Sequence, residues 1–538
     1  MKRYFYTIGV LACLIAFSGC NKWLSEPQPA RPGLEEFFAS GGAAAIQVVN
    51  GAYVPVQWEY GSTYSSEWWI GDVASDDALK GGQNVSDMSA GFELDNFRVS
   101  DNNAILLDMY QMNYQGVARC NLAIEQIPLI APDSIMTESV KQRLIGEAKF
   151  LRAFYYFRLV RIFQELPLVT VTIKSSSEWK QPKATAEKIY ERIVADLLDA
   201  NSKLWTLSQI RANPSEIGRA TKGAAQALLL KAYLYQGQYA QAKQWGDSII
   251  NSGQYGLEPR YSDNFSIYNE NGIESVFEAQ YSEEASSDYG SFNPHFGGTR
   301  GTFTTVLTRS RSTKMPKLAS GGAAKGWGFN KPTQSLYNEF EDGDIRRDAS
   351  ILNLPDSMMS NTNEEIYLGC RYLSRKYALM DDNNNALWNG HETRSPINIK
   401  LIRYADVLLM YAEACNELGD IAGATATLNY LRSVRRSECA NPATQLPDFP
   451  YGSYGSNQND MRLALRHERR VELAMEGHRW FDIVRWGIAK QVMDDYKQNE
   501  TAAVQAEMGT FVKGKNEYFP LPQYELDLSG LEQNNRFK

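Results

Sequence analysis

Aromatic side chains stand beside carboxylate, amide and guanidinium side chains in three polar parts of this sequence. A planar ring can stack on the C–H face of a sugar, while neighbouring Asp, Asn or Arg side chains bond the sugar hydroxyls. The candidate ligand-binding residues are Trp68, Trp69, Asp76, Asp77, Phe92 and Asn96 in the first part, Tyr281, Tyr289, Phe292, Asn293, His295, Arg300, Trp327 and Phe329 in the second, and Trp388 with Asn389 in the third. The alternative for each ring is that it fills the local core and meets no ligand.

A calcium-type pattern lies in the third part. Asp381, Asn383 and Asn385 alternate, and Glu392 falls at the twelfth position, which is the ligand spacing of an EF-hand loop. Ala386 stands where such a loop needs glycine for its sharp turn, and an acidic, Asn-rich run is also typical of a solvated loop. Structural Ca²⁺ at these positions is therefore a candidate, and no other cofactor is expected.

The spacing of acidic residues and histidines argues against catalysis. Hydrolysis of a glycosidic bond needs two carboxylates across a cleft. Asp76 and Asp77 are adjacent, so on a strand they would point to opposite faces. His467-Glu468 is not followed by the histidine that a zinc-protease helix requires. We therefore expect no catalytic residues and no enzyme.

The first twenty residues are typical of a bacterial lipoprotein signal. Lys2 and Arg3 give a positive start, residues 8–17 are apolar apart from one glycine, and Ser18 and Gly19 precede Cys20. This apolar run is too short for a stable transmembrane helix. We expect residues 1–19 to be removed and Cys20 to carry the lipid; ordinary signal cleavage is the alternative.

Composition narrows the classes of protein that fit. Of 538 residues 43% are hydrophobic, which indicates a folded body rather than disorder. The net charge of −8 disfavours a nucleic-acid partner, since phosphate binding needs a basic face. The cysteines after Cys20, which are Cys120, Cys370, Cys415 and Cys439, form no CxxC pair and no disulfide framework.

Helical periodicity dominates the rest of the chain. Apolar spacing predicts helices over 104–127, 139–163, 184–204, 221–237, 238–251, 402–419, 420–436, 459–476 and 478–487. The polar stretches 58–97 and 281–327 read as long loops with short strands. The fold class is therefore mainly α, with the candidate ligand residues in insertions on a helical scaffold.

An internal repeat indicates how the helices pair. Ala232, Gly237, Ala240 and Ala242 recur at identical spacing as Ala414, Gly419, Ala422 and Ala424. Small residues at these points let two antiparallel helices approach around a tight turn, as in tetratricopeptide-like (TPR-like) helix pairs. A chance match between two helical hairpins is the alternative.

Four segments closely resemble the SusD/RagB family of outer-membrane lipoproteins. They are EAKFLRAFYYF (147–157) with LPL (166–168), IRYADVLLMYAEA (402–414), ERRVELAMEGHRWFDIVRWG (468–487) and YFPLPQ (518–523). The lipid-type cysteine, Cys20, also stands where the family has one. The resemblance covers essentially the whole chain.

The resemblance implies a single SusD-like body over 20–538, with an N-terminal region at 20–215 and a C-terminal region at 216–538. It implies TPR-like helix pairs and a lipid anchor in the outer membrane, facing the cell surface. It also implies a role in nutrient uptake and polysaccharide utilisation, in which the protein binds an oligosaccharide and passes it to a SusC-like TonB-dependent porin. The matched segments are scaffold and do not carry the ligand site.

Other functions remain open from the residues alone. A peptide-capturing receptor of the same fold, a glycoside hydrolase and a pure scaffold are the alternatives to glycan binding. A peptide receptor differs from a glycan receptor in its polar groups, which would suit backbone amides rather than hydroxyls.

Overall fold

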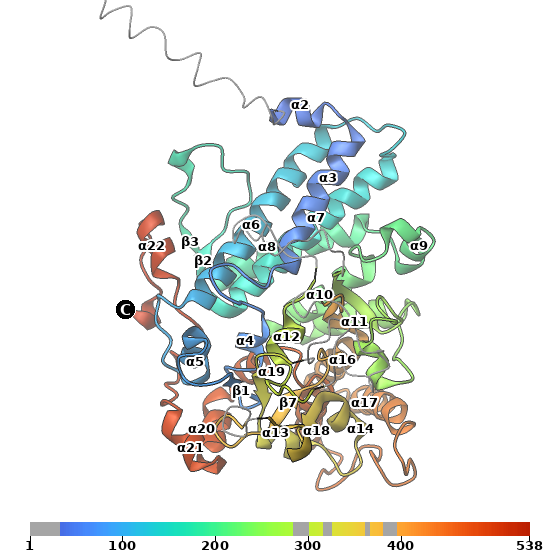
Figure 1. Ribbon diagram of the computed structural model, residues 1–538. Helices are drawn as coiled ribbons and strands as arrows, with labels where there is room; N and C mark the ends of the chain where they lie inside the picture. The colour runs from blue at the N-terminus through green and yellow to red at the C-terminus, as the bar shows by residue number, and fades with distance from the viewer. Residues whose placement is uncertain (1–32, 283–300, 316–324, 361–365, 380–394) are drawn as a thin grey trace, which may run out of the picture.

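Helices dominate the structure, a computed structural model that describes residues 33–282, 301–315, 325–360, 366–379 and 395–538 (Figure 1). The helices of ten or more residues are α3 (Gly42–Tyr53), α6 (Ala104–Gln126), α7 (Glu138–Phe163), α8 (Ala186–Lys203), α10 (Lys222–Tyr235), α11 (Tyr239–Ile250), α16 (Tyr404–Glu417), α17 (Ile421–Arg436), α18 (Gln458–Glu472) and α20 (Ala489–Asn499). Shorter helices are α2 (Leu34–Phe38), α4 (Trp68–Gly71), α5 (Ser89–Asp95), α9 (Leu207–Arg211), α12 (Thr304–Thr308), α13 (Gln334–Glu339), α14 (Ile345–Ser350), α19 (Arg479–Arg485), α21 (Ala502–Glu507) and α22 (Gln523–Ser529). The predicted mainly α class is confirmed.

The long helices stack as successive antiparallel pairs. α7 packs on α8, α8 on α10, α10 on α11, α11 on α16, and α16 on both α17 and α18. Side chains cap several of these helices: Asn103, Thr137, Thr185 and Thr221 each accept a hydrogen bond from a backbone N–H of the first turn. The result is a continuous scaffold whose apolar core runs through α7, α10 and α16.

The predicted repeat corresponds to the pairs α10–α11 and α16–α17. Gly237 and Gly419 end the first helix of each pair with φ of 68° and 82°, a conformation that a side chain would strain. Four of the repeated alanines are completely buried, namely Ala232, Ala242, Ala414 and Ala424, whereas Ala240 and Ala422 are exposed and do not mediate the helix approach. The helix-pair prediction is therefore confirmed.

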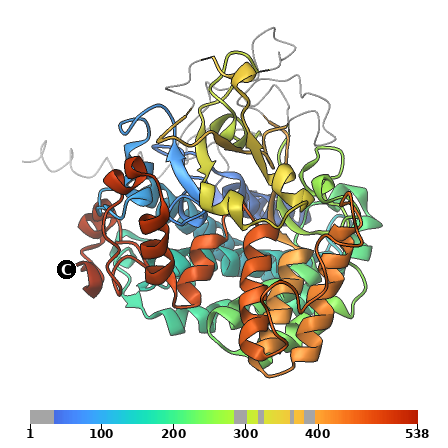
Figure 2. The same ribbon diagram turned by 90° about the horizontal axis from the view of Figure 1, so that it is seen from below.

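The strands form short antiparallel ribbons. These are β1 (Ala78–Gly81) with β5 (Phe329–Pro332), β2 (Leu166–Pro167) with β3 (Lys183–Ala184), β4 (Ser275–Ala279) with β8 (Ile399–Arg403), and β6 (Ile351–Asn353) with β7 (Tyr372–Ser374). Figure 2 shows the segments 301–315, 325–360 and 366–379 gathered on one side of the helical scaffold. The ribbon β1–β5 joins the two polar insertions, with Leu79 opposite Lys331 and Gly81 opposite Phe329.

Some predicted boundaries differ from the structure. Residues 402 and 403 were expected to begin a helix, but they belong to β8 because Ile402 and Arg403 pair with β4. The stretch 58–97 was expected to be loop and strand, yet it contains α4 and α5 as well as β1. Within the described part of the chain, no helix has the length and apolarity to cross a membrane.

A buried ion-pair network joins the scaffold helices α17 and α18 to α14 and β8. It consists of Arg346, Lys376, Arg403, Arg432 and Arg435 with Glu274, Asp344, Glu468, Glu472 and Glu476. Glu472 lies at its centre and contacts Arg346 at 3.0 Å, Arg403 at 3.1 Å and Arg435 at 2.8 Å. Arg432 also pairs with Glu341 at 2.8 Å, so every cation of the network has at least one carboxylate partner.

Candidate functional site

The two tryptophans of the first polar part lie in the core. Trp69 is 0% exposed, and its ring contacts those of Trp68 and Phe329 with centroids at 4.3 and 5.5 Å. A Cβ placed on Gly91 would come within 2.4 Å of the Trp69 ring, so the packing is tight. Trp68 is 8% exposed and donates its indole N–H to Thr304 Oγ1 at 3.3 Å. The expectation of exposed rings is wrong for Trp68, Trp69 and Phe329, because α4 buries the two tryptophans and Phe329 of β5 packs against Trp69.

Tyr281 and Asn96 are also buried. Tyr281 is 9% exposed, and its hydroxyl donates to the carbonyl of Gln57 at 3.0 Å. Asn96 donates its side-chain amide to the carbonyl of Phe92 at 3.0 Å. Phe92 itself is half-buried and lies 5.7 Å from the guanidinium of Arg98. The side chains of Tyr281 and Asn96 are therefore buried in this packing, and their roles as ligand contacts stay predictions.

Asp76 and Asp77 form buried ion pairs. Asp76 contacts Arg479 Nε and Arg470 Nη2, both at 2.8 Å, and Asp77 contacts Arg470 Nε at 2.8 Å. Burial would raise the pKa of Asp76, but Arg470 and Arg479 outweigh burial and hold that pKa below its ordinary value. Burial raises the pKa of Asp77 to about 6.

Unequal pKa values in two adjacent carboxyls are also typical of catalytic acid–base pairs. Here the side chains of Asp76 and Asp77 are buried and bonded to arginines. Asp76 also lines a hollow, so its role as a ligand contact stays a prediction, as does that of Asp77. The arrangement is that of a structural charge cluster.

Trp327 belongs to a half-buried aromatic cluster on the surface. We call Tyr60, Tyr64 and Trp327 the aromatic face. The ring of Tyr64 lies 5.0 Å from that of Trp327 and 4.8 Å from that of Tyr60, in edge-to-face geometry. Phe303 lies beneath, 5.3 Å from Tyr64. All three rings of the face keep partial exposure, which is what stacking on an apolar ligand surface requires.

A tight hairpin presents the two tyrosines. Tyr60 and Tyr64 form an antiparallel bridge, and between them the N–H of Gly61 donates to the carbonyl of Thr63 at 3.0 Å. Asp108 on α6 accepts the backbone N–H groups of Ser62 and Thr63 at 2.9 and 2.8 Å. The hairpin is thus attached to a long scaffold helix. Sequence reasoning missed it, although a Gly-Ser-Thr turn between two tyrosines is a hairpin signal.

Glu59 fixes the floor of the aromatic face. Its carboxylate accepts the hydroxyl of Thr302 at 2.6 Å, the backbone N–H of Phe303 at 2.7 Å and the hydroxyl of Ser66 at 3.1 Å. The bonds to Thr302 and Phe303 join residues that are more than 240 positions apart in the sequence. The two insertions are therefore held in one fixed arrangement beneath the rings.

A polar rim adjoins Trp327. Arg311 donates to the carbonyl of Trp327 at 3.2 Å, and its guanidinium lies 3.5 Å from both Asp87 and the side-chain oxygen of Gln83. Gln83 is exposed, and Arg311 is half-buried. Rings with an amide, a carboxylate and a guanidinium beside them match the pattern expected of a sugar-binding platform.

The remaining predicted residues lie outside the described residues. These are Tyr289, Phe292, Asn293, His295, Arg300 and Trp388 with Asn389, and the calcium candidates Asp381, Asn383, Asn385 and Glu392. Their roles stay predictions.

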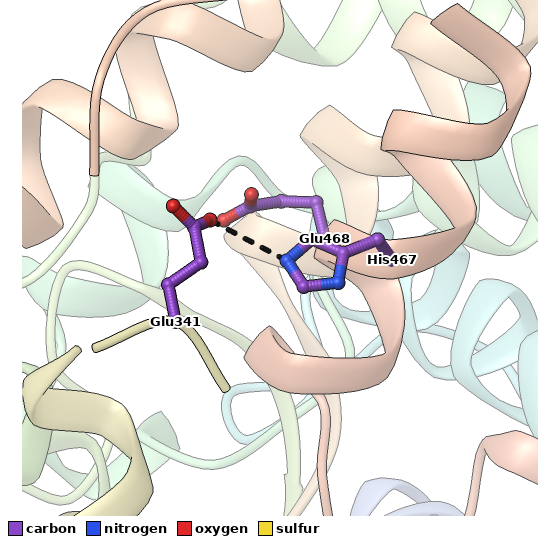
Figure 3. A group of neighbouring side chains, drawn as sticks. All are labelled: Glu341, His467 and Glu468. Atoms are coloured by element: carbon purple, nitrogen blue, oxygen red, sulfur yellow. Dashed lines mark ion pairs between the residues drawn. The ribbon is translucent and has the colours of Figure 1, made fainter. Parts of the chain in front are cut away.

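Glu341, His467 and Glu468 form the one His/Cys/Asp/Glu group with metal-like spacing in the described part of the chain (Figure 3). Arg432 already bonds Glu341 and Glu468 at 2.8 and 2.7 Å, and His467 lies 3.4 Å from Glu341. Burial would lower the pKa of His467, but hydrogen bonds to Glu339 and Glu341 raise it to about 9. A charged imidazolium has no lone pair for a metal, so this group is an ion-pair cluster.

The charge on His467 makes stability depend on pH. Its pKa rises from 6.5 unfolded to about 9 folded, so its contribution is complete below about pH 6.5 and is lost as the pH rises through about 9. We expect His467→Gln to be destabilised by roughly 1–3 kcal/mol at neutral pH and to approach the wild type above about pH 9. Urea unfolding of both proteins across this range measures the gap; a gap that does not change with pH would contradict the assignment.

Comparison with known proteins gives consistent matches. Residues 359–537 match the model described as "SusD family", and residues 46–234 match the model described as "Starch-binding associating with outer membrane". The "SusD-like protein P2" of Formosa agariphila is 27% identical over 508 residues, covering 91% of this chain and 92% of that protein.

Solved structures share the fold. A "Laminarin binding SusD-like protein" is 26% identical with a TM-score of 0.72, covering 92% of this chain and 99% of its own. "Surface glycan-binding protein A from Bacteroides fluxus" is 25% identical with a TM-score of 0.75 and the same coverage.

Proposed function

Because the chain belongs to the SusD/RagB family, we propose that it is a non-enzymatic receptor that binds a glycan at the aromatic face. The observation that carries this proposal is the cluster of Tyr60, Tyr64 and Trp327, three half-buried rings at a fixed spacing beside polar groups. The printed names of the laminarin-binding and surface glycan-binding relatives support the same class of ligand.

The location and partner are also part of the proposal. Cys20 would carry a lipid that holds the body at the outer membrane, facing the cell surface. The description of the model that matches residues 46–234, which names association with the outer membrane, supports this place. The receptor would then pass its oligosaccharide to a SusC-like TonB-dependent porin.

Affinity electrophoresis tests the ligand class. We expect the chain from Asn21 onward to be retarded by one class of polysaccharide, and Trp327→Ala and Tyr64→Ala to weaken binding at least about tenfold, or about 1.4 kcal/mol. The reason is that each variant removes a ring face on which a sugar can stack. Trp179→Ala is the matched control, since Trp179 is 69% exposed and lies outside the aromatic face.

Circular dichroism must show that each variant is folded. Equal retardation of the wild type and both aromatic-face variants would reject this site. Retention of peptides with no retardation by any glycan would favour a peptide receptor, and release of reducing ends from a polysaccharide would favour a hydrolase.

A further inference from the structure

A hollow, which we call the polar groove, lies away from the aromatic face. Its volume is about 560 Å³, within the range of small-molecule sites. It is lined by α13, α20, the start of α21 and the turn before β7, and its floor includes Asp76, Leu79 and Tyr496. Figure 1 shows α13, α20 and α21 at the end of the molecule opposite α2.

The ribbon β1–β5 separates the groove from the aromatic face. Trp327 stands just before β5, and Thr333, which lines the groove, follows its last residue. The four residues of β5 alone extend over roughly 10 Å. The two places are therefore distinct, at opposite ends of one ribbon.

Tyr496 provides the observation that points to a ligand. It is 6% exposed and lines the groove, and its hydroxyl finds no hydrogen-bond partner among the described residues. Burial raises the pKa of this phenol well above its ordinary value, so the hydroxyl keeps its proton and can donate. A buried hydroxyl without a partner costs free energy, which a ligand in the groove would recover.

The lining chemistry suits a neutral, hydroxyl-rich ligand. Arg470 and Arg479 are already paired with Asp76, so the groove offers no spare cation for a phosphate. The rim instead carries exposed amides and a hydroxyl, from Gln334, Asn338, Asn499 and Thr501. The carboxylates of Glu339, Asp495 and Glu500 also line the groove, where they accept hydrogen bonds from hydroxyls and repel an anion. Leu79, Val492 and Val504 add an apolar wall. Amides, a hydroxyl and carboxylates together with an apolar wall match the rim and face of a sugar ring.

We propose that the polar groove is a second binding site, for a neutral saccharide of roughly one to three rings, anchored by the Tyr496 hydroxyl. Binding in the polar groove does not require the aromatic face. An experiment can therefore disprove the groove site and the proposed function separately.

Saturation-transfer NMR on the Trp327→Ala variant tests the groove. The probes are neutral trisaccharides of glucose, xylose, mannose and galactose at millimolar concentration. We expect transfer from at least one of them, and an approximately tenfold loss of affinity when Tyr496→Phe is added, because one hydrogen bond is removed. Asn338→Trp, which places a large ring at the exposed rim, is expected to abolish the signal.

Tyr451→Phe is the matched control. The Tyr451 hydroxyl is also buried and lacks a partner among the described residues, but Tyr451 does not line the groove. Without ligand, both Tyr→Phe variants should be as stable as their parent, which separates binding from folding. No transfer from any probe, or transfer that Tyr496→Phe and Asn338→Trp leave unchanged, overturns the inference, whatever the wild type binds at the aromatic face.

Discussion

Glu472→Gln is expected to lower the free energy of unfolding by about 3–5 kcal/mol, the usual cost of breaking a buried ion pair. Glu472 faces Arg346, Arg403 and Arg435, and all four side chains are essentially inaccessible to solvent. Burial would raise the pKa of Glu472, but Arg435 and the other two arginines hold it well below its ordinary value. Glutamine keeps the shape and removes the charge, so it leaves three buried cations with one carboxylate too few.

Urea unfolding with tryptophan fluorescence measures this loss. Glu191→Gln is the control, because Glu191 is 63% exposed and pairs with Lys188 on the surface of α8, where we expect a change within about 0.5 kcal/mol. Equal stability of Glu472→Gln and the wild type would show that the network tolerates an unbalanced charge.

The ion-pair network is connected to α4 through Gly477. Glu472 and Glu476 precede Gly477, whose N–H donates to Asp72 at 2.8 Å. The backbone of Gly477 also lies so close to Gly71 that a Cβ there would come within 2.1 Å of its carbonyl oxygen. Because Gly71 ends α4, this contact fixes the position of α4. Trp68 of that helix donates to Thr304, the residue that follows Phe303 beneath the aromatic face.

Trp69→Ala is expected to cost about 3–5 kcal/mol of stability, as deletion of a large buried ring usually does. The ring is fully buried between Trp68, Gly91 and Phe329, so its removal leaves a cavity in tight packing. Protein that remains folded should still bind glycan at the aromatic face, since Trp69 presents no ring face to solvent. Thermal unfolding and affinity electrophoresis of the same preparation measure both quantities.

Trp327→Ala is the variant with which the binding and the stability of Trp69→Ala are compared. That variant should lose binding and keep more of its stability, because the Trp327 ring is half-exposed. The reverse pattern, with Trp69→Ala stable and unable to bind, would mean that Trp69 reaches the ligand and that the packing changes on binding.

The helical scaffold could be predicted from the sequence because its signals are local. Apolar residues at helical spacing, the glycines at 237 and 419 and the alanines around them specify α10, α11, α16 and α17 within a few neighbouring positions. Boundaries failed where a distant partner decided them: Ile402 and Arg403 look helical in sequence, but they pair with β4 more than 120 residues earlier.

The site was decided by tertiary structure. Trp69 and Trp327 have similar polar surroundings in sequence, yet one is enclosed and the other half-exposed, because the burial of a ring depends on elements hundreds of residues away. In the same way, Asp76 and Asp77 are paired by Arg470 and Arg479 from the far end of the chain. Composition and spacing therefore determined the scaffold and the kind of residues available for binding, whereas only the packing of the two insertions against each other selected which of them face solvent.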